Sequence, residues 1–488
     1  MVIYLGFLIG AFNLLILFPR FIPVEYMGLT KVIQDYSVLI TSFASLGFIA
    51  PFFRFSPYFQ KYTLTGRNDL LQLYLIVVHV GMLVLVILSI ALKGVVTGYF
   101  NTRSPLFSTY YYSTLVFGYL LLIYNVLEMY LFSKGEAIFQ SMVREIIIRV
   151  IIGILVVAVI LGLPLNYFIG LFAIHYIVPI GLLTWFIIKN HPTRIGISIS
   201  KTTRRLIPFM FSMAGVGMLQ NVVNAGLPVI DTLVVGSLVG LEGVANYLIS
   251  TYIATLVYVP VRATGGVLGA RIAAFWKDNN LDRIQELYHR TSMSYLIFCF
   301  FVVSVILFNI NLFQKVLGSN ISLNLSVIVL LVAAKVFDLS TGLSNVVLGY
   351  SKKWRWESAI GIFALIIALP MNIFFVGKWG IMGAAFSGLV LAFIVFTVRL
   401  IILYQVYGLF PFNLNSLAFV ILGLGLSGVF YWLCQQTELI LLKILVTLVY
   451  MLVYVGLVLR FKFSEDVNLI FITIQNRFLT WRNRQRSK

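Results

Sequence analysis

Two opposite charges stand three residues apart inside an apolar stretch of this sequence. Residues 327–338 read V-I-V-L-L-V-A-A-K-V-F-D, so Lys335 and Asp338 end a run that is suited to hydrocarbon. A charge at the centre of a membrane helix costs about 2.5–3.5 kcal/mol on insertion scales, and such residues mark ion or substrate pathways. The pair therefore predicts either mutual neutralisation or a polar surface that handles a charged ligand.

Small and polar residues continue from this pair at helical spacing, and two other apolar runs carry similar stripes. The three stripes are Lys335, Asp338, Gly342, Asn345 and Gly349; Asn221, Asn224, Pro228 and Asp231; and Thr251, Thr255, Tyr258 and Arg262. Spacings of three and four place each set on one helix face. Because full charges are too costly to face lipid, the stripes predict a water-filled cavity. Ordinary helix packing through polar and small residues is the alternative.

A fourth group of polar residues lies near the predicted cytoplasmic ends of two apolar runs. Its members are Asn125, Glu128, Arg144, Glu145 and Arg149. Glu145 and Arg149 are four residues apart, a spacing that favours an ion pair on a helix. We interpret the group as a structural ion-pair cluster at headgroup level, with gating as the alternative.

Composition shows which elements must position these residues. The chain has 488 residues, of which 61% are hydrophobic and 10% are charged, whereas a soluble domain is about 25% charged. About fourteen runs are long enough to span a bilayer. They lie near 2–18, 32–53, 70–92, 107–132, 144–163, 165–188, 206–237, 241–270, 291–313, 321–349, 357–376, 380–406, 413–434 and 438–460. We expect an all-α integral membrane protein.

The net charge of +19 follows membrane topology rather than nucleic-acid binding. Most of the 35 Lys and Arg residues fall in alternate loops and at the carboxyl end, which predicts that both termini are cytoplasmic and that the basic loops meet anionic lipid. The first run has no basic flank, so we expect native residues to precede Met1. The tail at 463–488 is predicted to be a basic amphipathic segment on the membrane surface or a solvated end.

Faint internal likeness predicts a duplicated architecture. The segment V-E-Y-M-G-L at 24–29 stands before the second run, as L-E-G-V-A-N at 241–246 stands before the eighth. An even number of helices separates the copies, so the repeat is parallel, with a pseudo-twofold axis along the membrane normal. The predicted parts are an N-lobe of helices 1–6 (1–190), a basic linker (191–205), a C-lobe of helices 7–12 (206–408), helices 13 and 14 (409–462) and the tail (463–488).

Catalytic and metal-binding motifs are not found. The four histidines are scattered, and Cys299 and Cys434 stand far apart in apolar runs, which predicts neither a metal site nor a disulfide. G-L-G-L-S-G at 423–428 matches a dinucleotide fingerprint, but it lies inside a predicted span with no strand before it, so helix packing explains it. We expect no cofactor and no enzymatic activity.

Several segments, in order along nearly the whole chain, carry a resemblance to a known family. They are V-I-Y-L-G-F-L-I-G-A-F-N (2–13), P-V-E-Y-M-G-L (23–29), V-P-V-R (259–262), F-W-K-D-N-N-L-D-R-I-Q-E-L-Y (275–288), K-V-F-D-L-S-T-G (335–342), G-Y-S-K-K-W-R-W-E (349–357) and W-G-I-M-G-A-A-F-S (379–387). Together they resemble bacterial oligosaccharide flippases of the multidrug/oligosaccharidyl-lipid/polysaccharide exporter superfamily, which translocate O-antigen or capsule repeat units.

The resemblance implies two six-helix lobes around a central cavity in the bacterial inner membrane. It also implies that a polyprenyl-diphosphate-linked glycan crosses from the cytoplasmic to the outer leaflet by alternating access, in polysaccharide or lipopolysaccharide biosynthesis. Glycan polymerase and other assembly proteins are candidate partners, and no nucleic acid is expected.

Roles for single residues follow from combining the resemblance with the polar stripes. Arg262 and then Lys335 are the expected diphosphate ligands, whereas Asp231 and Asp338 are candidates for coupling to H+ or Na+. Asn221, Asn224, Thr255 and Tyr258 would contact sugars. A lipid II flippase and a multidrug/cation antiporter of the same superfamily remain alternatives, and a membrane glycosyltransferase or polymerase is the enzyme alternative.

Overall fold

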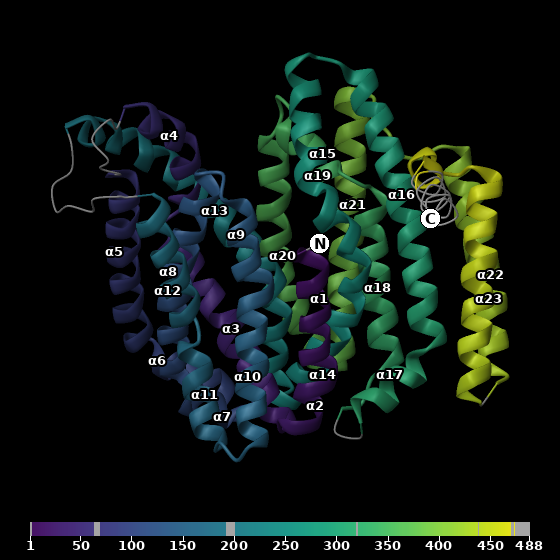
Figure 1. Ribbon diagram of the computed structural model, residues 1–488, viewed down its shortest axis with the longest axis horizontal. Coiled ribbons are helices and arrows are strands. Elements are labelled where there is room, and N and C mark those ends of the chain that lie inside the picture. The colour runs from purple at the N-terminus through teal and green to yellow at the C-terminus, as the bar shows by residue number, and fades with distance from the viewer. Residues whose placement is uncertain are drawn as a thin grey trace, which may run out of the picture. The chain divides into compact units, whose positions relative to one another are not determined.

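The computed structural model describes residues 2–62, 69–191, 201–318, 321–437, 439–469 and 473, and each regular element within these ranges is a helix (Figure 1). The elements are α1 (Val2–Phe12), η1 (Asn13–Leu17), α2 (Phe18–Phe21), α3 (Val24–Ala44), α4 (Ile49–Tyr62), α5 (Asp69–Ala91), α6 (Lys93–Asn101), α7 (Pro105–Thr109), α8 (Tyr111–Ser133), α9 (Ala137–Met142), η2 (Val143–Ile147), α10 (Ile148–Ile160), α11 (Leu165–Ile174), α12 (Ile177–Asn190), α13 (Lys201–Leu238), α14 (Leu241–Thr255), η3 (Leu256–Tyr258), α15 (Val259–Lys277), α16 (Leu281–Phe308), α17 (Ile310–Leu317), α18 (Leu325–Ser340), α19 (Ser344–Tyr350), α20 (Arg355–Trp379), α21 (Ile381–Tyr407), α22 (Leu414–Gln435) and α23 (Ile440–Phe461).

The helices confirm the prediction of an all-α, multi-pass membrane protein. Within the described ranges, 11 helices are long and apolar enough to cross a membrane, and two bent pairs raise the number to 13. The predicted run at 144–163 corresponds to α9, η2 and α10, which follow one another directly. This run carries Arg144, Glu145 and Arg149 in its first half, so it is less apolar than the others although it is long enough.

Contacts divide the chain into two compact units. Unit 1 comprises Met1–Ile249, Val316–Leu323 and Gly361–Ser387, and unit 2 comprises Ser250–Lys315, Asn324–Ile360 and Gly388–Lys488. The predicted lobes, by contrast, were bounded by the sequence repeat and by the basic linker at 191–205. The lobe boundaries and the pseudo-twofold relation therefore stay predictions, and most of the linker and of the tail at 463–488 lies outside the described residues.

In unit 1, α3 is surrounded by other helices and forms the centre of the packing. It contacts α13, α8 and α5, and Met27, Leu29 and Val32 on it are fully buried. The Ser37 hydroxyl donates to the carbonyl of Thr114 at 2.7 Å, which is the kind of interhelical bond that joins membrane helices. This packing fixes α13, the helix that carries Asn221, Asn224 and Asp231.

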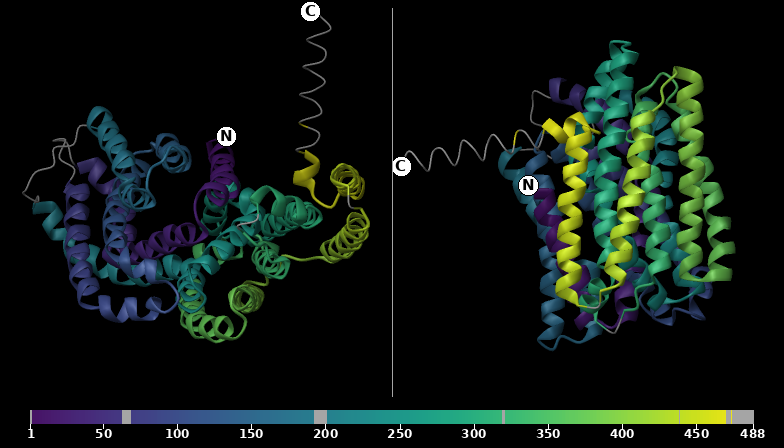
Figure 2. Two further views of the ribbon diagram at one scale, coloured as in Figure 1. Left: turned by 90° about the horizontal axis from the view of Figure 1, so that it is seen from below. Right: turned by 90° about the vertical axis from the view of Figure 1, so that its right-hand side faces the viewer.

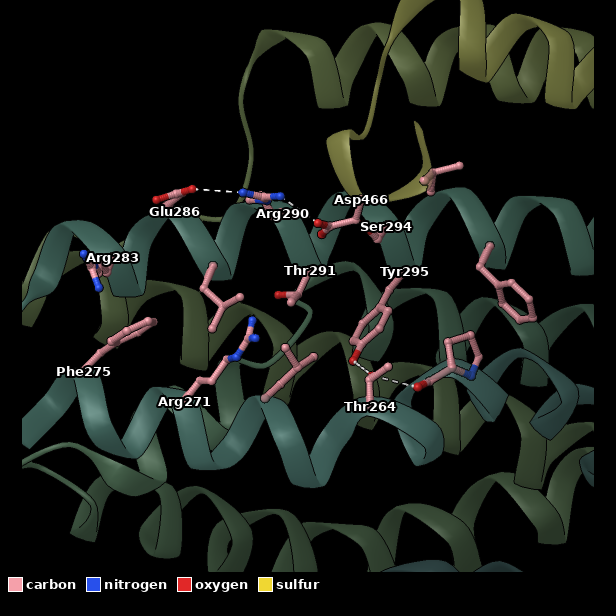
Figure 3. A pocket seen from close by; sticks show the side chains of 15 residues that line it. Thr264, Arg271, Phe275, Arg283, Glu286, Arg290, Thr291, Ser294, Tyr295 and Asp466 are labelled. Atoms are coloured by element: carbon pink, nitrogen blue, oxygen red, sulfur yellow. Dashed lines mark hydrogen bonds and ion pairs between the residues drawn. The ribbon is translucent and has the colours of Figure 1, made fainter. Parts of the chain in front are cut away.

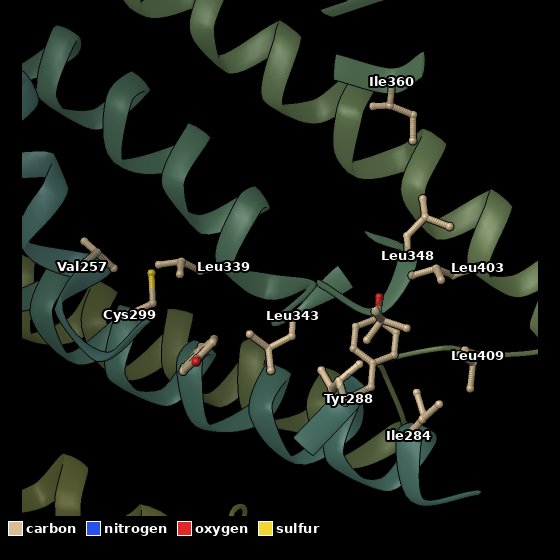
Figure 4. Close-up of a cluster of buried hydrophobic side chains, with 13 residues drawn as sticks. Val257, Ile284, Tyr288, Cys299, Leu339, Leu343, Leu348, Ile360, Leu403 and Leu409 are labelled. Atoms are coloured by element: carbon tan, nitrogen blue, oxygen red, sulfur yellow. The ribbon is translucent and has the colours of Figure 1, made fainter. Parts of the chain in front are cut away.

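In unit 2, an apolar cluster joins α15, α16, α18, α19 and α21. Tyr288, Cys299 and Leu403 are fully buried in it (Figure 4). The indole nitrogen of Trp276 on α15 also donates to the carbonyl of Val347 on α19 at 3.0 Å. These contacts hold the two polar stripes of α15 and α18 within one packed body.

The two last long helices of unit 2 form a layer of their own. α22 and α23, yellow in Figure 2, run side by side, and both contact α16. Their core includes Phe419, Tyr450 and Tyr454, and the Tyr454 hydroxyl donates to the carbonyl of Ile297 at 2.6 Å. Gly423, in the glycine-rich segment at 423–428, lies against the ring of Phe300, as expected for a packing role.

The predicted helix at 321–349 is broken where a continuous polar face was expected. α18 ends at Ser340 and α19 begins at Ser344, with a bend of 44° between them. Gly342 lies in this break with φ of +56°, and a Cβ atom built on it would stand 2.6 Å from the hydroxyl oxygen of Ser292. The prediction that Lys335, Gly342 and Gly349 share one helix face is therefore wrong. The left-handed turn at Gly342 changes the direction of the chain, so the residues of α19 do not continue the face of α18.

We expect Gly342→Ala to destabilise the protein by about 1–3 kcal/mol, because the left-handed conformation and the contact with Ser292 both oppose a Cβ atom. Gly349→Ala is the matched control, since no atom lies within 4 Å of its built Cβ. Thermal unfolding of the purified protein in detergent measures both changes. Equal melting temperatures for the two variants would contradict this account of the break.

Candidate functional site

A lysine side chain of unit 2 lies beside an aromatic ring at the start of α15. The chain leaves α14 at Thr255, makes the short helix η3 and enters α15 at Val259, with Pro260 in the first turn, where proline is well tolerated. The Nζ atom of Lys335 lies 5.1 Å from the centre of the Tyr258 ring, within the range of a cation–π contact. Arg262 follows Tyr258 by four residues, but Tyr258 ends η3 and Arg262 lies in α15, so the run that was predicted as one continuous helix at 241–270 is interrupted within this stripe.

Arg262 is exposed, and its guanidinium makes no hydrogen bond or ion pair with the residues that the structure describes. Five N–H donors thus remain available for an anion. The roles of Arg262 and Lys335 as diphosphate ligands stay predictions. Thr255, one turn earlier, is half-buried and donates to the carbonyl of Tyr252 at 2.8 Å, which leaves its oxygen as an acceptor.

Asp338 has a partner that the sequence did not indicate. One Nη atom of Arg399 on α21 lies 3.7 Å from a carboxylate oxygen of Asp338. The same guanidinium donates two hydrogen bonds to Glu357 on α20, one of them from Nε at 3.1 Å. Asp338 is thus one arm of an ion triad around Arg399. The hypothesis that Asp338 neutralises Lys335 stays a prediction, and Arg399 is an additional partner of Asp338.

In unit 1, Asp231 on α13 is held by two helices. Its two carboxylate oxygens accept hydrogen bonds from the Tyr247 hydroxyl at 2.6 Å and from the Asn372 amide at 2.9 Å. Asn372 lies on α20 and is only 1% exposed. Asp231 itself is half-buried. A carboxylate within a membrane-spanning helix is a group that can take up a proton or a cation, and this role of Asp231 stays a prediction.

The two other predicted residues on α13 make weaker contacts. The Asn221 amide donates to the Ser45 hydroxyl at 3.3 Å, and the Asn224 carbonyl oxygen accepts from Gln220 at 3.2 Å. Asn224 is exposed and Asn221 is half-buried. Since α13 is one unbroken helix, Asn221, Asn224 and Asp231 do share the expected face.

The polar cluster at the ends of α8 and α9 forms a chain of ion pairs in unit 1. Arg144 lies 3.4 Å from Glu128 and 3.3 Å from Glu145, and Glu145 lies 2.7 Å from Arg149. Gln140 also donates to Glu128 at 2.6 Å. Asn125 makes no polar contact within the described ranges.

The amino-terminal helix is packed against this chain of ion pairs. A Cβ atom built on Gly6 would stand 2.4 Å from the carbonyl oxygen of Glu145. The Asn13 amide donates to the carbonyl of Arg149 at 2.6 Å. These close contacts agree with the structural interpretation of the cluster, and its gating role stays a prediction.

Sequence reasoning missed three participants, namely Arg399, Glu357 and Asn372. Arg399 was counted as a cytoplasmic loop residue, although eight helical residues follow it in α21. Its position inside an apolar run was the signal that could have identified it. Asn372 was a lone polar residue after Pro370 in a run of apolar residues. Among the residues that the structure places, no group of three or more His, Cys, Asp or Glu side chains could hold a metal ion.

Comparison with known proteins gives structural neighbours but no sequence relatives. Neither the protein-family models nor the curated proteins that were searched match this chain. A lipid II flippase, MurJ, in an inward closed conformation is similar with a TM-score of 0.72 and 15% sequence identity, over 94% of this chain and 98% of that chain.

Two structures of a multidrug resistance MATE family transporter of the MOP superfamily are also similar. The inward-facing conformation has a TM-score of 0.60 at 14% identity, and the outward-facing conformation has 0.51 at 12%. Each match covers 82% of this chain and 94% of the other. At this level of identity the likeness concerns the fold, and this chain has the fold of these membrane transporters.

Proposed function

We propose that the protein is a flippase that moves a polyprenyl-diphosphate-linked oligosaccharide from the cytoplasmic to the outer leaflet of a bacterial inner membrane. The observation that carries the proposal is the exposed guanidinium of Arg262, which has no ion-pair or hydrogen-bond partner among the described residues. The transporter fold supports it as an analogy. A diphosphate cannot cross hydrocarbon unaided, and guanidinium groups bind phosphate oxygens in bidentate geometry.

Polar side chains of each unit, taken separately, could bind the rest of such a substrate. Thr255 offers a hydroxyl oxygen, and Asn224 offers an exposed amide, so both can exchange hydrogen bonds with sugar hydroxyls. Asn221 and the ring of Tyr258 are further candidate sugar contacts. The lipid tail remains in the bilayer while the charged headgroup crosses. Glycan polymerase and other assembly proteins are proposed partners on the same pathway.

Transport would proceed by exchange between inward-open and outward-open states whose populations shift with substrate binding. Asp231 is the proposed coupling residue for H+ or Na+, because its carboxylate lies within an apolar membrane-spanning helix and accepts hydrogen bonds from Tyr247 and Asn372. Asp338 is a weaker candidate, since Arg399 already balances its charge.

We expect Asp231→Asn to abolish acceleration of transport by a H+ or Na+ gradient while leaving folding intact. The asparagine keeps the shape of the site, and its one carbonyl oxygen can accept a hydrogen bond from Asn372 while its NH2 group donates to the Tyr247 hydroxyl, but it cannot take up a proton or neutralise a cation. Flipping in proteoliposomes with and without each gradient measures the effect. Glu242→Gln, a change at an exposed carboxylate, is the control. If the variant responds to a gradient as the wild type does, the coupling role is wrong.

A lipid II flippase is the second candidate function, because the structure of such a flippase is similar over nearly the whole chain. A multidrug antiporter is the third, favoured by the two transporter structures. Proteoliposomes that contain the full chain can be offered a fluorescent polyprenyl-diphosphate oligosaccharide, lipid II and a cationic dye in turn. The proposal expects the first to flip fastest. Movement of the dye alone would overturn it in favour of an antiporter.

A further inference from the structure

Unit 2 contains a cavity that is lined by both charged and apolar side chains. It has a volume of about 610 Å³ and lies between α15, α16 and the segment that follows α23 (Figure 3). Its lining includes Thr264 and Arg271 from α15, Arg283 and Tyr295 from α16, and Asp466. The residues assigned to transport, Arg262 and Lys335, are not among those that line it.

The cavity is charged at one end and apolar at the other. Arg271, Arg283, Glu286, Arg290 and Asp466 gather toward the start of α16 and the end of α15, whereas Pro260, Leu268, Tyr295 and Phe298 line the remainder. The stretch of α16 from Arg283 to Phe298 is about 22 Å long. The Thr264 hydroxyl bonds with the Tyr295 hydroxyl at 2.8 Å, so the polar atoms in the apolar part are satisfied.

At the polar end of the cavity, Arg290 forms ion pairs, whereas Arg271 and Arg283 form none among the described residues. Arg290 lies 3.1 Å from Glu286, 3.3 Å from Glu465 and 2.7 Å from Asp466, so its guanidinium is fully engaged. Arg271 points into the cavity (Figure 3) and makes no hydrogen bond or ion pair within the described part of the chain. The guanidinium carbon of Arg283 lies 5.9 Å from the ring centre of Phe275, and no carboxylate in the described ranges pairs with it.

We propose that this cavity is a binding site for a membrane phospholipid, with the phosphodiester held by Arg271 and Arg283 and one acyl chain along Leu268, Tyr295 and Phe298. Basic pockets between membrane helices bind phosphate headgroups, and the length and polarity of the cavity match an amphiphile. The site is separate from the proposed transport function and does not depend on it.

Two carboxylates at the polar end of the cavity favour binding of a phosphodiester over binding of the diphosphate of the proposed transport substrate. A diphosphate carries more negative charge than a phosphodiester and would be repelled by Glu286 and Asp466, which also line the cavity. A phosphodiester carries one negative charge, so it is repelled less, while Arg271 and Arg283 still attract it. A glycan with a long prenyl chain also exceeds a volume that, in other proteins, holds one ligand of drug size.

The test measures lipid binding to the purified full-length protein in detergent by native mass spectrometry. Phosphatidylglycerol is compared with diacylglycerol of the same acyl chains, with polyprenyl diphosphate and with inorganic phosphate as a competitor. We expect the wild type to retain phosphatidylglycerol at least tenfold more tightly than diacylglycerol. Arg271→Gln/Arg283→Gln should weaken this binding at least tenfold. The control pair Arg204→Gln/Arg205→Gln, exposed on α13, should change it less than twofold.

A second variant tests the apolar part of the site. Leu268→Trp fills the cavity without changing charge, so it should also weaken phosphatidylglycerol binding at least tenfold, and thermal unfolding shows that the variant is folded. Equal binding of diacylglycerol, or an equal loss in the control pair, would overturn the proposal. Tighter binding of polyprenyl diphosphate than of phosphatidylglycerol would also overturn it, because the cavity would then be a binding site for the transport substrate. Displacement by inorganic phosphate alone at equal concentration would show an ion site rather than a lipid site.

Discussion

Arg399→Leu is expected to destabilise the protein by about 3–5 kcal/mol, the largest stability effect that we predict. The Arg399 side chain is 15% exposed and that of Glu357 is 19% exposed. Removing the guanidinium leaves the largely buried Glu357 carboxylate without its partner, whereas Asp338, whose side chain is 46% exposed, loses a longer contact of 3.7 Å. An uncompensated buried charge costs far more than the intact pair contributes.

Thermal unfolding in detergent measures this effect, with Arg355→Leu as control. Arg355 is exposed and lies on α20, the helix that also carries Glu357, so its loss should change stability by about 0.5 kcal/mol or less. Adding Glu357→Gln to Arg399→Leu should recover part of the stability, because it removes one of the unbalanced charges. An Arg399→Leu protein as stable as the control would contradict the predicted contribution of the triad to stability.

Arg262→Gln is expected to lower the rate of lipid-linked oligosaccharide flipping at least roughly tenfold, since charge-assisted hydrogen bonds to phosphate are among the strongest polar contacts. Stability should not change, because the guanidinium has no partner among the described residues to lose. Arg262→Lys should keep part of the activity, because it retains the charge but not the bidentate geometry.

The control for Arg262 is Arg355→Gln, which removes the same charge from another exposed position of unit 2. Initial rates over a range of substrate concentrations separate weaker binding from slower movement. Transport at the wild-type rate by a folded Arg262→Gln protein would exclude this residue from substrate binding.

Hydropathy was sufficient to predict the helices, because a span must satisfy its backbone internally and cover it with apolar side chains. It did not predict the break at Gly342, since a glycine inside an apolar run looks the same whether it packs in a helix or adopts a left-handed turn. The stripe on α13 was recovered as one face because no such break interrupts that helix.

The partners of the charged residues were harder to predict than their positions. Asp338 and Lys335 are close in sequence, which suggested that they pair, but Arg399 is brought to Asp338 by the packing of α21. Likewise Tyr247 and Asn372 reach Asp231 from two other helices. Local spacing carries no information on such long-range contacts, whereas the cost of an unpaired charge does indicate that a partner must exist.

The most direct measurement compares two substrates that differ only in charge. The same oligosaccharide and prenyl chain are joined through a diphosphate in one and through a neutral linkage in the other, and both are offered to proteoliposomes that contain the wild-type protein. If Arg262 and Lys335 bind the diphosphate, the charged substrate should flip at least tenfold faster than the neutral one, and Arg262→Gln should remove most of the difference. Equal rates for the two substrates would contradict the account.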